Sequence, residues 1–133
     1  MKFNGMINHV EINVSDLSNS RKFWEIFLSK LGYELYQSWN DGYSYIKNGT
    51  YIVFVQTREP YLRLKYHRSA TGLNHIAFHV EDREEVDSFR ELIKNHGLRE
   101  LYADKYPHAG GDDNYALYFE DPDRIKVEVT CEI

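Results

Sequence analysis

Apolar and polar side chains alternate along two short segments of the chain, residues 8–16 and 74–82. The apolar positions are Val10, Ile12 and Val14 in the first segment and Ile76, Phe78 and Val80 in the second. A period of two is typical of a β-strand that buries one face and leaves the other accessible. Each segment therefore predicts a strand, and the face opposite the apolar one begins with a histidine in both cases, His9 or His75.

The two segments are also related to each other by an internal repeat. At an offset of 66 residues, Asn8, His9, Val14 and Asp16 recur as Asn74, His75, Val80 and Asp82. Each copy covers about half of the chain, and so few residues bury too little apolar surface to be stable alone. The repeat therefore predicts two modules that pack together, within one chain or between two chains.

A helix is predicted after each of these strands, and three further strands after each helix. Apolar residues recur three or four positions apart at Phe23, Phe27 and Leu31, then at Val86, Phe89 and Ile93. The strands are expected near residues 33–39, 43–47 and 51–57, then near 99–104, 115–120 and 125–131. The predicted fold class is α+β: two βαβββ modules that form a cupped, mostly antiparallel sheet with the helices on its outer face. We expect a single domain over residues 1–133, with module one at about 5–57, a linker at 58–72 and module two at about 73–133.

The helices must cover the apolar face of each sheet, so the opposite face carries the candidate chemistry. In the last strand of module two, Val127 and Val129 are expected under the helix and Glu128 on the opposite face. In module one, Val53 and Val55 are expected under the helix. The residues predicted on the histidine-bearing face are then His9, Glu11, Asn13, Ile52, Phe54, Gln56, His75, His79 and Glu128.

Two histidines at one repeat position and a carboxylate on a neighbouring strand suggest a metal site. Imidazole and carboxylate are ligands for Zn, Fe, Mn and Ni, and three protein ligands leave positions open for water or substrate. The predicted metal ligands are His9, His75 and Glu128. The predicted substrate-binding residues around them are Glu11, Asn13, Phe54, Gln56 and His79.

Composition narrows the function further. The net charge of the 133 residues is −5, which disfavours binding to nucleic acid through phosphate contacts. No apolar stretch is long enough to span a bilayer, and the first residues do not form an apolar signal region. A single cysteine, Cys131, fits a reducing compartment, so we expect a cytoplasmic protein.

Three segments resemble the vicinal oxygen chelate superfamily, which includes glyoxalase I, extradiol dioxygenases, fosfomycin-resistance enzymes and bleomycin-binding proteins. They are Asn8-His9-Val10, residues 73–78 and residues 118–129, the last with the pattern aromatic-x-Asp-Pro-Asp-x-x-x-x-Glu. In that pattern Arg124 stands where glycine is commoner. The resemblance implies the metal ligands given above, a homodimer with two sites, and a metal-dependent enzyme acting on a small oxygen-rich substrate as a lyase, isomerase or small-molecule-modifying transferase.

Several alternatives remain open from the sequence. Glyoxalase-like members carry a fourth ligand on the last strand of module one, where our alignment places Phe54, which cannot bind metal; Gln56 is the candidate substitute. The second function class is a metal-free, antibiotic-binding protein of the bleomycin-resistance type. The loop around His108 is either a lid or a surface loop, and the basic stretch around Arg68 either contacts an anionic substrate or is a solvated linker. The chain that supplies each ligand in a dimer is not decided.

Overall fold

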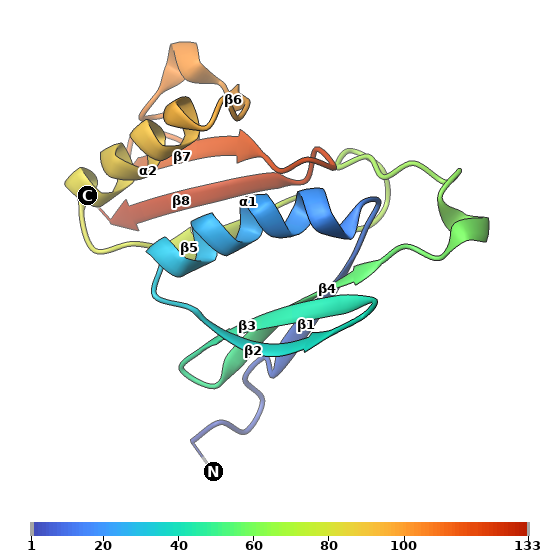
Figure 1. Ribbon diagram of the computed structural model, residues 1–133. Helices are drawn as coiled ribbons and strands as arrows, with labels where there is room; N and C mark the ends of the chain where they lie inside the picture. The colour runs from blue at the N-terminus through green and yellow to red at the C-terminus, as the bar shows by residue number, and fades with distance from the viewer. Residues whose placement is uncertain (1, 133) are drawn as a thin grey trace. The chain divides into compact units, whose positions relative to one another are not determined.

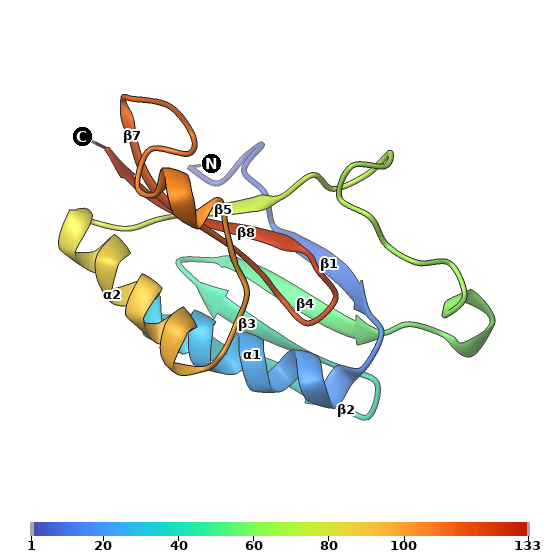
Figure 2. The ribbon, with the colours of Figure 1, turned by 90° about the horizontal axis from the view of Figure 1, so that it is seen from above.

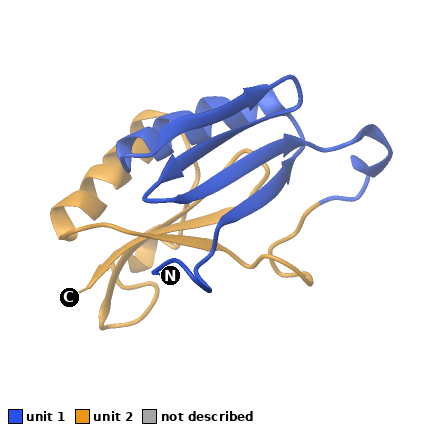
Figure 3. Cartoon of the chain, turned by 90° about the horizontal axis from the view of Figure 1, so that it is seen from below, with its two compact units in different colours: residues 1–65 blue, residues 66–133 orange. Residues whose placement is uncertain are grey.

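The computed structural model describes residues 2–132 and divides into two compact units, unit 1 (residues 1–65) and unit 2 (residues 66–133) (Figure 3). The boundary falls inside the segment expected to be a linker. Residues Glu59–Tyr61 form a short 3₁₀ helix, η1, in unit 1. Arg68, by contrast, bonds to Glu120 within unit 2. The second half of the expected linker therefore belongs to unit 2.

Unit 1 has the predicted order of one strand, one helix and three strands (Figure 1). These elements are β1 (His9–Val14), α1 (Leu17–Lys30), β2 (Glu34–Trp39), β3 (Gly42–Lys47) and β4 (Thr50–Gln56). The sheet order is β1-β4-β3-β2, with β1 parallel to β4 and the other two pairs antiparallel. The first strand thus lies beside the last, as far from its sequence neighbour β2 as the sheet allows.

Unit 2 repeats this topology. Its elements are β5 (Ile76–His79), α2 (Arg83–Asn95), β6 (Glu100–Leu101), β7 (Asn114–Glu120) and β8 (Lys126–Glu132), in the sheet order β5-β8-β7-β6. The α+β fold class and the two βαβββ modules are therefore confirmed, as two separately hydrogen-bonded four-stranded sheets. The strand expected over 99–104 is shorter than predicted. Tyr102 adopts a left-handed backbone (φ 58°), and the chain turns into a second 3₁₀ helix, η2 (Ala103–Lys105).

Both helices begin and end with local sequence signals. Asp16 and Asp82 are the N-caps, and each side chain accepts a hydrogen bond from the backbone N–H three residues later. Gly32 and Gly97 follow the C-terminal ends with positive φ, which a side chain would disfavour. The α-helices of residues 2–132 are α1 and α2, and neither is long and apolar enough to cross a membrane.

Each helix covers one face of the sheet in its own unit (Figures 1 and 2). In unit 1 the fully buried Trp24 of α1 lies against Phe54 of β4, with ring centroids 4.8 Å apart. In unit 2 the buried residues of α2 are Val86, Phe89 and Ile93, and those of the facing strands include Leu117, Phe119, Val127 and Val129. Burial of these side chains fixes which face of each sheet remains for other functions.

The predicted orientation of β4 is wrong. Phe54 was expected on the histidine-bearing face, but it is fully buried on the helix side, between Trp24 and Tyr43. The strand register explains the error. Glu11 pairs with Val53 in unit 1 as Ala77 pairs with Glu128 in unit 2, so Val53 is the equivalent of Glu128. An alignment one residue out of register moves every side chain of a strand to the opposite face.

Candidate metal and substrate site

A histidine and a buried glutamate lie in contact on the face of the unit 2 sheet opposite α2. His75 directly precedes β5, and its Nε2 lies 3.1 Å from Oε1 of Glu128 on β8. The side chain of Glu128 is 8% exposed and that of His75 is 32% exposed. The pairing of β5 with β8 brings these two residues together across 53 positions of sequence. Two of the three predicted metal ligands are therefore neighbours.

The orientation of the His75 ring favours a cation beside Glu128. Nδ1 lies 2.7 Å from Oδ1 of Asn74, an acceptor, so Nδ1 carries the ring proton that this contact requires. In the neutral ring Nε2 then has a lone pair, and it faces a carboxylate oxygen. Two acceptors at hydrogen-bond distance are favourable only with a proton or a metal ion between them. The donor set and its second-sphere support therefore fit a divalent metal.

Tyr118 completes the surroundings of Glu128. It lies directly opposite Glu128 across the β7–β8 pair, and its ring is edge-on to His75 at 6.2 Å. Burial and then the charge of Glu128, together with a hydrogen bond to it, raise the pKa of Tyr118 to about 12. The phenol stays protonated at neutral pH, so it donates to the carboxylate and holds one of its oxygens in place.

Unit 1 carries the corresponding histidine in a similar setting. Nδ1 of His9 lies 2.7 Å from Oδ1 of Asn8, the same contact as between His75 and Asn74. The His9 ring also stacks on Tyr51 of β4, with centroids 4.7 Å apart and planes 11° from parallel. Both histidines are thus oriented by the preceding asparagine, which occupies Nδ1 and leaves Nε2 as the other ring nitrogen in each.

The other predicted site residues divide into two groups. Glu11, Asn13 and His79 are exposed on the strand faces that carry the histidines. Gln56 lies elsewhere, because it follows Phe54 on the helix side. Its Oε1 accepts from the N–H of Leu17 and its Nε2 donates to the carbonyl of Ser15. Gln56 therefore holds the start of α1 and does not replace a fourth ligand, and the position equivalent to Glu128 is the apolar Val53.

Among residues 2–132, no group of three or more His, Cys, Asp or Glu side chains lies together in a way that could hold a metal ion. The pair His75–Glu128 belongs to unit 2, and His9 belongs to unit 1. The predicted ligands are thus present as one His–Glu pair and one single histidine. The imidazole ring of each histidine is oriented by its asparagine.

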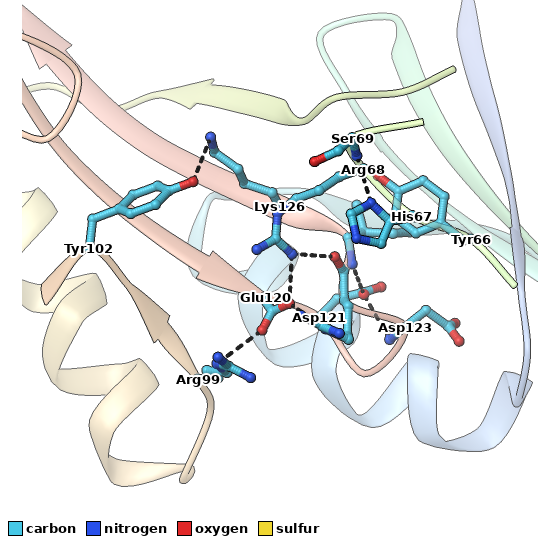
Figure 4. A network of polar contacts seen from close by, with 12 residues as sticks. Tyr66, His67, Arg68, Ser69, Arg99, Tyr102, Glu120, Asp121, Asp123 and Lys126 are labelled. Carbon is cyan, nitrogen blue, oxygen red and sulfur yellow. Dashed lines mark hydrogen bonds and ion pairs between the residues drawn. The ribbon is translucent and has the colours of Figure 1, made fainter. Parts of the chain in front are cut away.

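Sequence reasoning missed the polar network shown in Figure 4. Glu120, a residue with a side chain only 3% exposed, accepts from Arg68 (2.7 Å) and Arg124 (3.0 Å) and forms an ion pair with Arg99 (3.3 Å). The basic stretch around Arg68 is therefore not solvated throughout. Arg68 is engaged by Glu120, so the stretch is also not wholly free to contact a substrate. Glu120 pairs with Lys126 in the β7–β8 register, which places Glu120 on the sheet face that carries Glu128. This placement can be inferred only once the β7–β8 pairing is known.

The loop between β6 and β7 is tied to α2. Tyr106 and Tyr115 both donate their hydroxyl groups to Asp87 of α2, the latter over 2.8 Å. The guanidinium of Arg90 lies 4.0 Å from the centroid of the Tyr106 ring. His108 donates from Nδ1 to the carbonyl of Asn114. The residues around His108 thus form an ordered loop anchored at several points.

This fold, with oriented histidines and a buried glutamate on the sheet face, is that of a vicinal oxygen chelate protein. The chain matches the family model "Glyoxalase/Bleomycin resistance protein/Dioxygenase superfamily" over residues 6–129 and belongs to this family. The uncharacterized protein YqjT of Bacillus subtilis (strain 168) is 51% identical over 125 residues, which are 94% of this chain and 98% of that protein.

Solved structures agree with this assignment. One reported as "a putative glyoxalase from Bacillus halodurans" has a TM-score of 0.96 and 50% identity, and the match covers 98% of both chains. Two more distant structures share the fold alone. The fosfomycin resistance protein FosX of Listeria monocytogenes has a TM-score of 0.68 and 23% identity, with 96% of this chain and 93% of that chain covered. Lactoylglutathione lyase of Agrobacterium tumefaciens has a TM-score of 0.66 and 18% identity, with the same coverage.

Proposed function

We propose that the chain is a divalent-metal-dependent enzyme acting on a small oxygen-rich substrate, as a lyase, isomerase or small-molecule-modifying transferase. The proposed metal ligands are His9, His75 and Glu128. The observation that carries the proposal is the contact between Nε2 of His75 and Glu128, with the proton of His75 directed to Asn74. Zn, Ni, Mn and Fe all accept this donor set.

The residues of the chain have separable tasks in this proposal. Asn8 and Asn74 fix the imidazole rings so that Nε2 is the ligand atom. Glu128 supplies the negative charge that offsets the charge of the ion. A divalent ion bound there supplies Lewis acidity, which stabilises negative charge developing on a substrate oxygen. The exposed Glu11, Asn13 and His79 are the proposed substrate contacts beside these ligands.

Relatives support the class of activity without fixing the reaction. Two fold neighbours are described as a lactoylglutathione lyase and a fosfomycin resistance protein. Their names indicate chemistry on small molecules, and we propose the same scale of substrate here. His9 lies in one unit and the His75–Glu128 pair in the other, and a homodimer is part of the proposal. A cytoplasmic location is part of the proposal, supported by the single free cysteine, Cys131.

A second candidate is a metal-free protein that binds an antibiotic or a similar small molecule. The observation that favours it is Val53, an apolar residue at the unit 1 position equivalent to Glu128. An apolar residue there gives no ligand and adds to an apolar wall. The two candidates differ in whether purified protein carries metal.

The test is the metal content of protein purified without chelator, measured by inductively coupled plasma mass spectrometry. We expect a bound first-row transition metal in the wild type and its loss in His9→Ala, His75→Ala and Glu128→Gln. His67→Ala is the matched control, because His67 is an exposed histidine whose contact is with Ser69. Wild-type protein without metal, or three ligand variants that retain it, would rule out the metal-dependent function.

A further inference from the structure

A lysine without a carboxylate partner lies beside the proposed metal ligands. Lys126 is half-buried on β8, two residues before Glu128, so both side chains lie on the same face of the sheet. Its Nζ lies 5.0 Å from the ring centroids of both Tyr102 and Tyr118 and donates to the Tyr102 hydroxyl over 3.3 Å. Two aromatic rings and one hydroxyl thus hold the ammonium group without neutralising it.

The natural carboxylate partner of Lys126 is occupied. Glu120 pairs with Lys126 across β7 and β8, so it is the residue from which an ion pair would be expected. Its carboxylate is taken instead by Arg68 and Arg99, both labelled in Figure 4, and by Arg124. Within residues 2–132 the ammonium of Lys126 makes no ion pair. The arginines therefore leave Lys126 available for an anion that the chain itself does not provide.

Glu128 on β8, the second acidic side chain near Lys126, is also engaged. His75 contacts one of its oxygens, and Tyr118 hydrogen bonds to it. Tyr118 therefore lies between the two charges, with its hydroxyl toward Glu128 and its ring toward Lys126. Residues two apart on a strand are separated by about 6.5 Å. One small molecule can therefore reach both Lys126 and a metal ion held by Glu128.

We propose that Lys126 binds an anionic group of the substrate, and that the substrate class is therefore small anionic molecules whose other end offers adjacent oxygens to the metal. This rests on the proposed metal-dependent function for the chelating end, but the anion contact itself needs only residues of unit 2. A carboxylate, phosphate or phosphonate satisfies the same chemistry. Tyr102 and Tyr118 restrain the ammonium before binding, which reduces the entropy lost on contact.

Two matched pairs of probes test this inference. Malate and lactate share an α-hydroxy carboxylate and differ by one added carboxylate, as do 2-hydroxyglutarate and 2-hydroxybutyrate with a longer spacer. Dissociation constants are measured by isothermal titration calorimetry at fixed ionic strength, with the metal-loaded and the metal-free protein. We expect the dianion of at least one pair to bind about tenfold more tightly than its monoanion in the wild type.

Lys126→Gln should abolish this preference while leaving the affinity for lactate and 2-hydroxybutyrate and the metal content unchanged. Lys126→Arg should retain a preference for the dianion, because the charge is kept. Lys94→Gln is the matched control, since it removes an exposed lysine from the last turn of α2. A wild type without preference in either pair, or an unchanged preference in Lys126→Gln, overturns the inference.

The outcomes separate this inference from the proposed function. Metal bound at the ligands with no Lys126-dependent preference leaves the metal-dependent function standing and rejects the anion contact. A Lys126-dependent preference in protein that binds no metal rejects the metal-dependent function and retains the anion contact. Absence of both rejects both.

Discussion

At the scale of single residues, the most informative side chains are those whose role depends on the face of the sheet to which they point. Phe54 and Val53 are adjacent on β4 and point to opposite faces, and the register places Phe54 against Trp24. Phe54 is therefore a core residue. Val53 stands at the position that holds Glu128 in unit 2.

Phe54→Ala should lower the free energy of unfolding by about 3–5 kcal/mol, because it removes a fully buried ring from the core of unit 1. Urea unfolding followed by tryptophan fluorescence measures this change, since Trp24 contacts the lost ring. The metal content of the folded variant should equal that of the wild type. A loss of metal at unchanged stability would place Phe54 in the site instead.

Glu120 makes stability depend on pH. Burial alone would raise the pKa of its carboxyl group, but hydrogen bonds and charges from Arg68 and Arg124 outweigh burial and lower the pKa below 4.5. A lowered pKa stabilises the folded state above the unfolded value, and this stabilisation is lost as the pH falls through the folded pKa. Glu120→Gln should therefore cost about 3 kcal/mol at pH 7 and progressively less below pH 4.5.

The measurement for Glu120 is urea unfolding of the wild type and of Glu120→Gln from pH 7 down to pH 3. The control is Glu84→Gln, which replaces an exposed carboxyl in the first turn of α2. A constant difference between wild type and Glu120→Gln across this range would contradict the ion-pair explanation.

At the scale of elements, the loop between β6 and β7 comes close to Tyr118 at Gly110. A Cβ atom at this position would lie 2.5 Å from the hydroxyl oxygen of Tyr118 and 2.6 Å from Nδ2 of Asn114. Gly111 next to it has φ 125° and open space around its Cβ position. The two glycines are thus required for different reasons, a close approach and a backbone angle.

Gly110→Ala should displace Tyr118 or the loop and cost about 1–3 kcal/mol of stability. Gly111→Ala should also destabilise, through backbone strain, but without moving Tyr118. Nuclear magnetic resonance of protein with ¹³C-labelled tyrosine Cζ distinguishes the two variants. Only Gly110→Ala should shift the Tyr118 signal, and equal shifts in both variants would refute the close approach.

The elements also show what the sequence could predict. The helices, their aspartate caps and the turn at Asn48-Gly49, where both residues have positive φ, all have local signals in the sequence. The short β6 and the direction of Phe54 were missed. Both depend on backbone geometry and pairing register. The alternation of apolar residues does not encode them, because a strand such as 51–57 is apolar at nearly every position.

At the scale of the whole molecule, the repeat predicted from Asn8-His9 and Asn74-His75 corresponds to two units with the same strand order. The matched settings of His9 and His75 were predictable for the same reason, because equivalent positions of a repeat place equivalent side chains. Lys126 and the arginines around Glu120 were not, since their relation depends on which cation reaches the buried carboxylate.

We expect the protein to be a homodimer, with a mass near twice 15.8 kDa by multi-angle light scattering. Large apolar side chains are exposed on β2, namely Leu35, Tyr36 and Trp39, and such exposed groups are typical of association surfaces. A mass of one chain at all concentrations from about 1 to 100 μM, a range in which homodimers of ordinary affinity dissociate, would contradict this expectation.

The anchoring of the β6–β7 loop on α2 has a consequence for evolution. The groups that hold the loop, Tyr106, Tyr115 and Asp87, contact one another and α2. Gly110, by contrast, lies close to the hydroxyl group of Tyr118. Substitutions near Gly110 can therefore change the surroundings of Tyr118 while the loop stays attached. Such a division lets one scaffold vary its exposed sheet face in few steps, as is expected where functions are carried by sites on a shared fold.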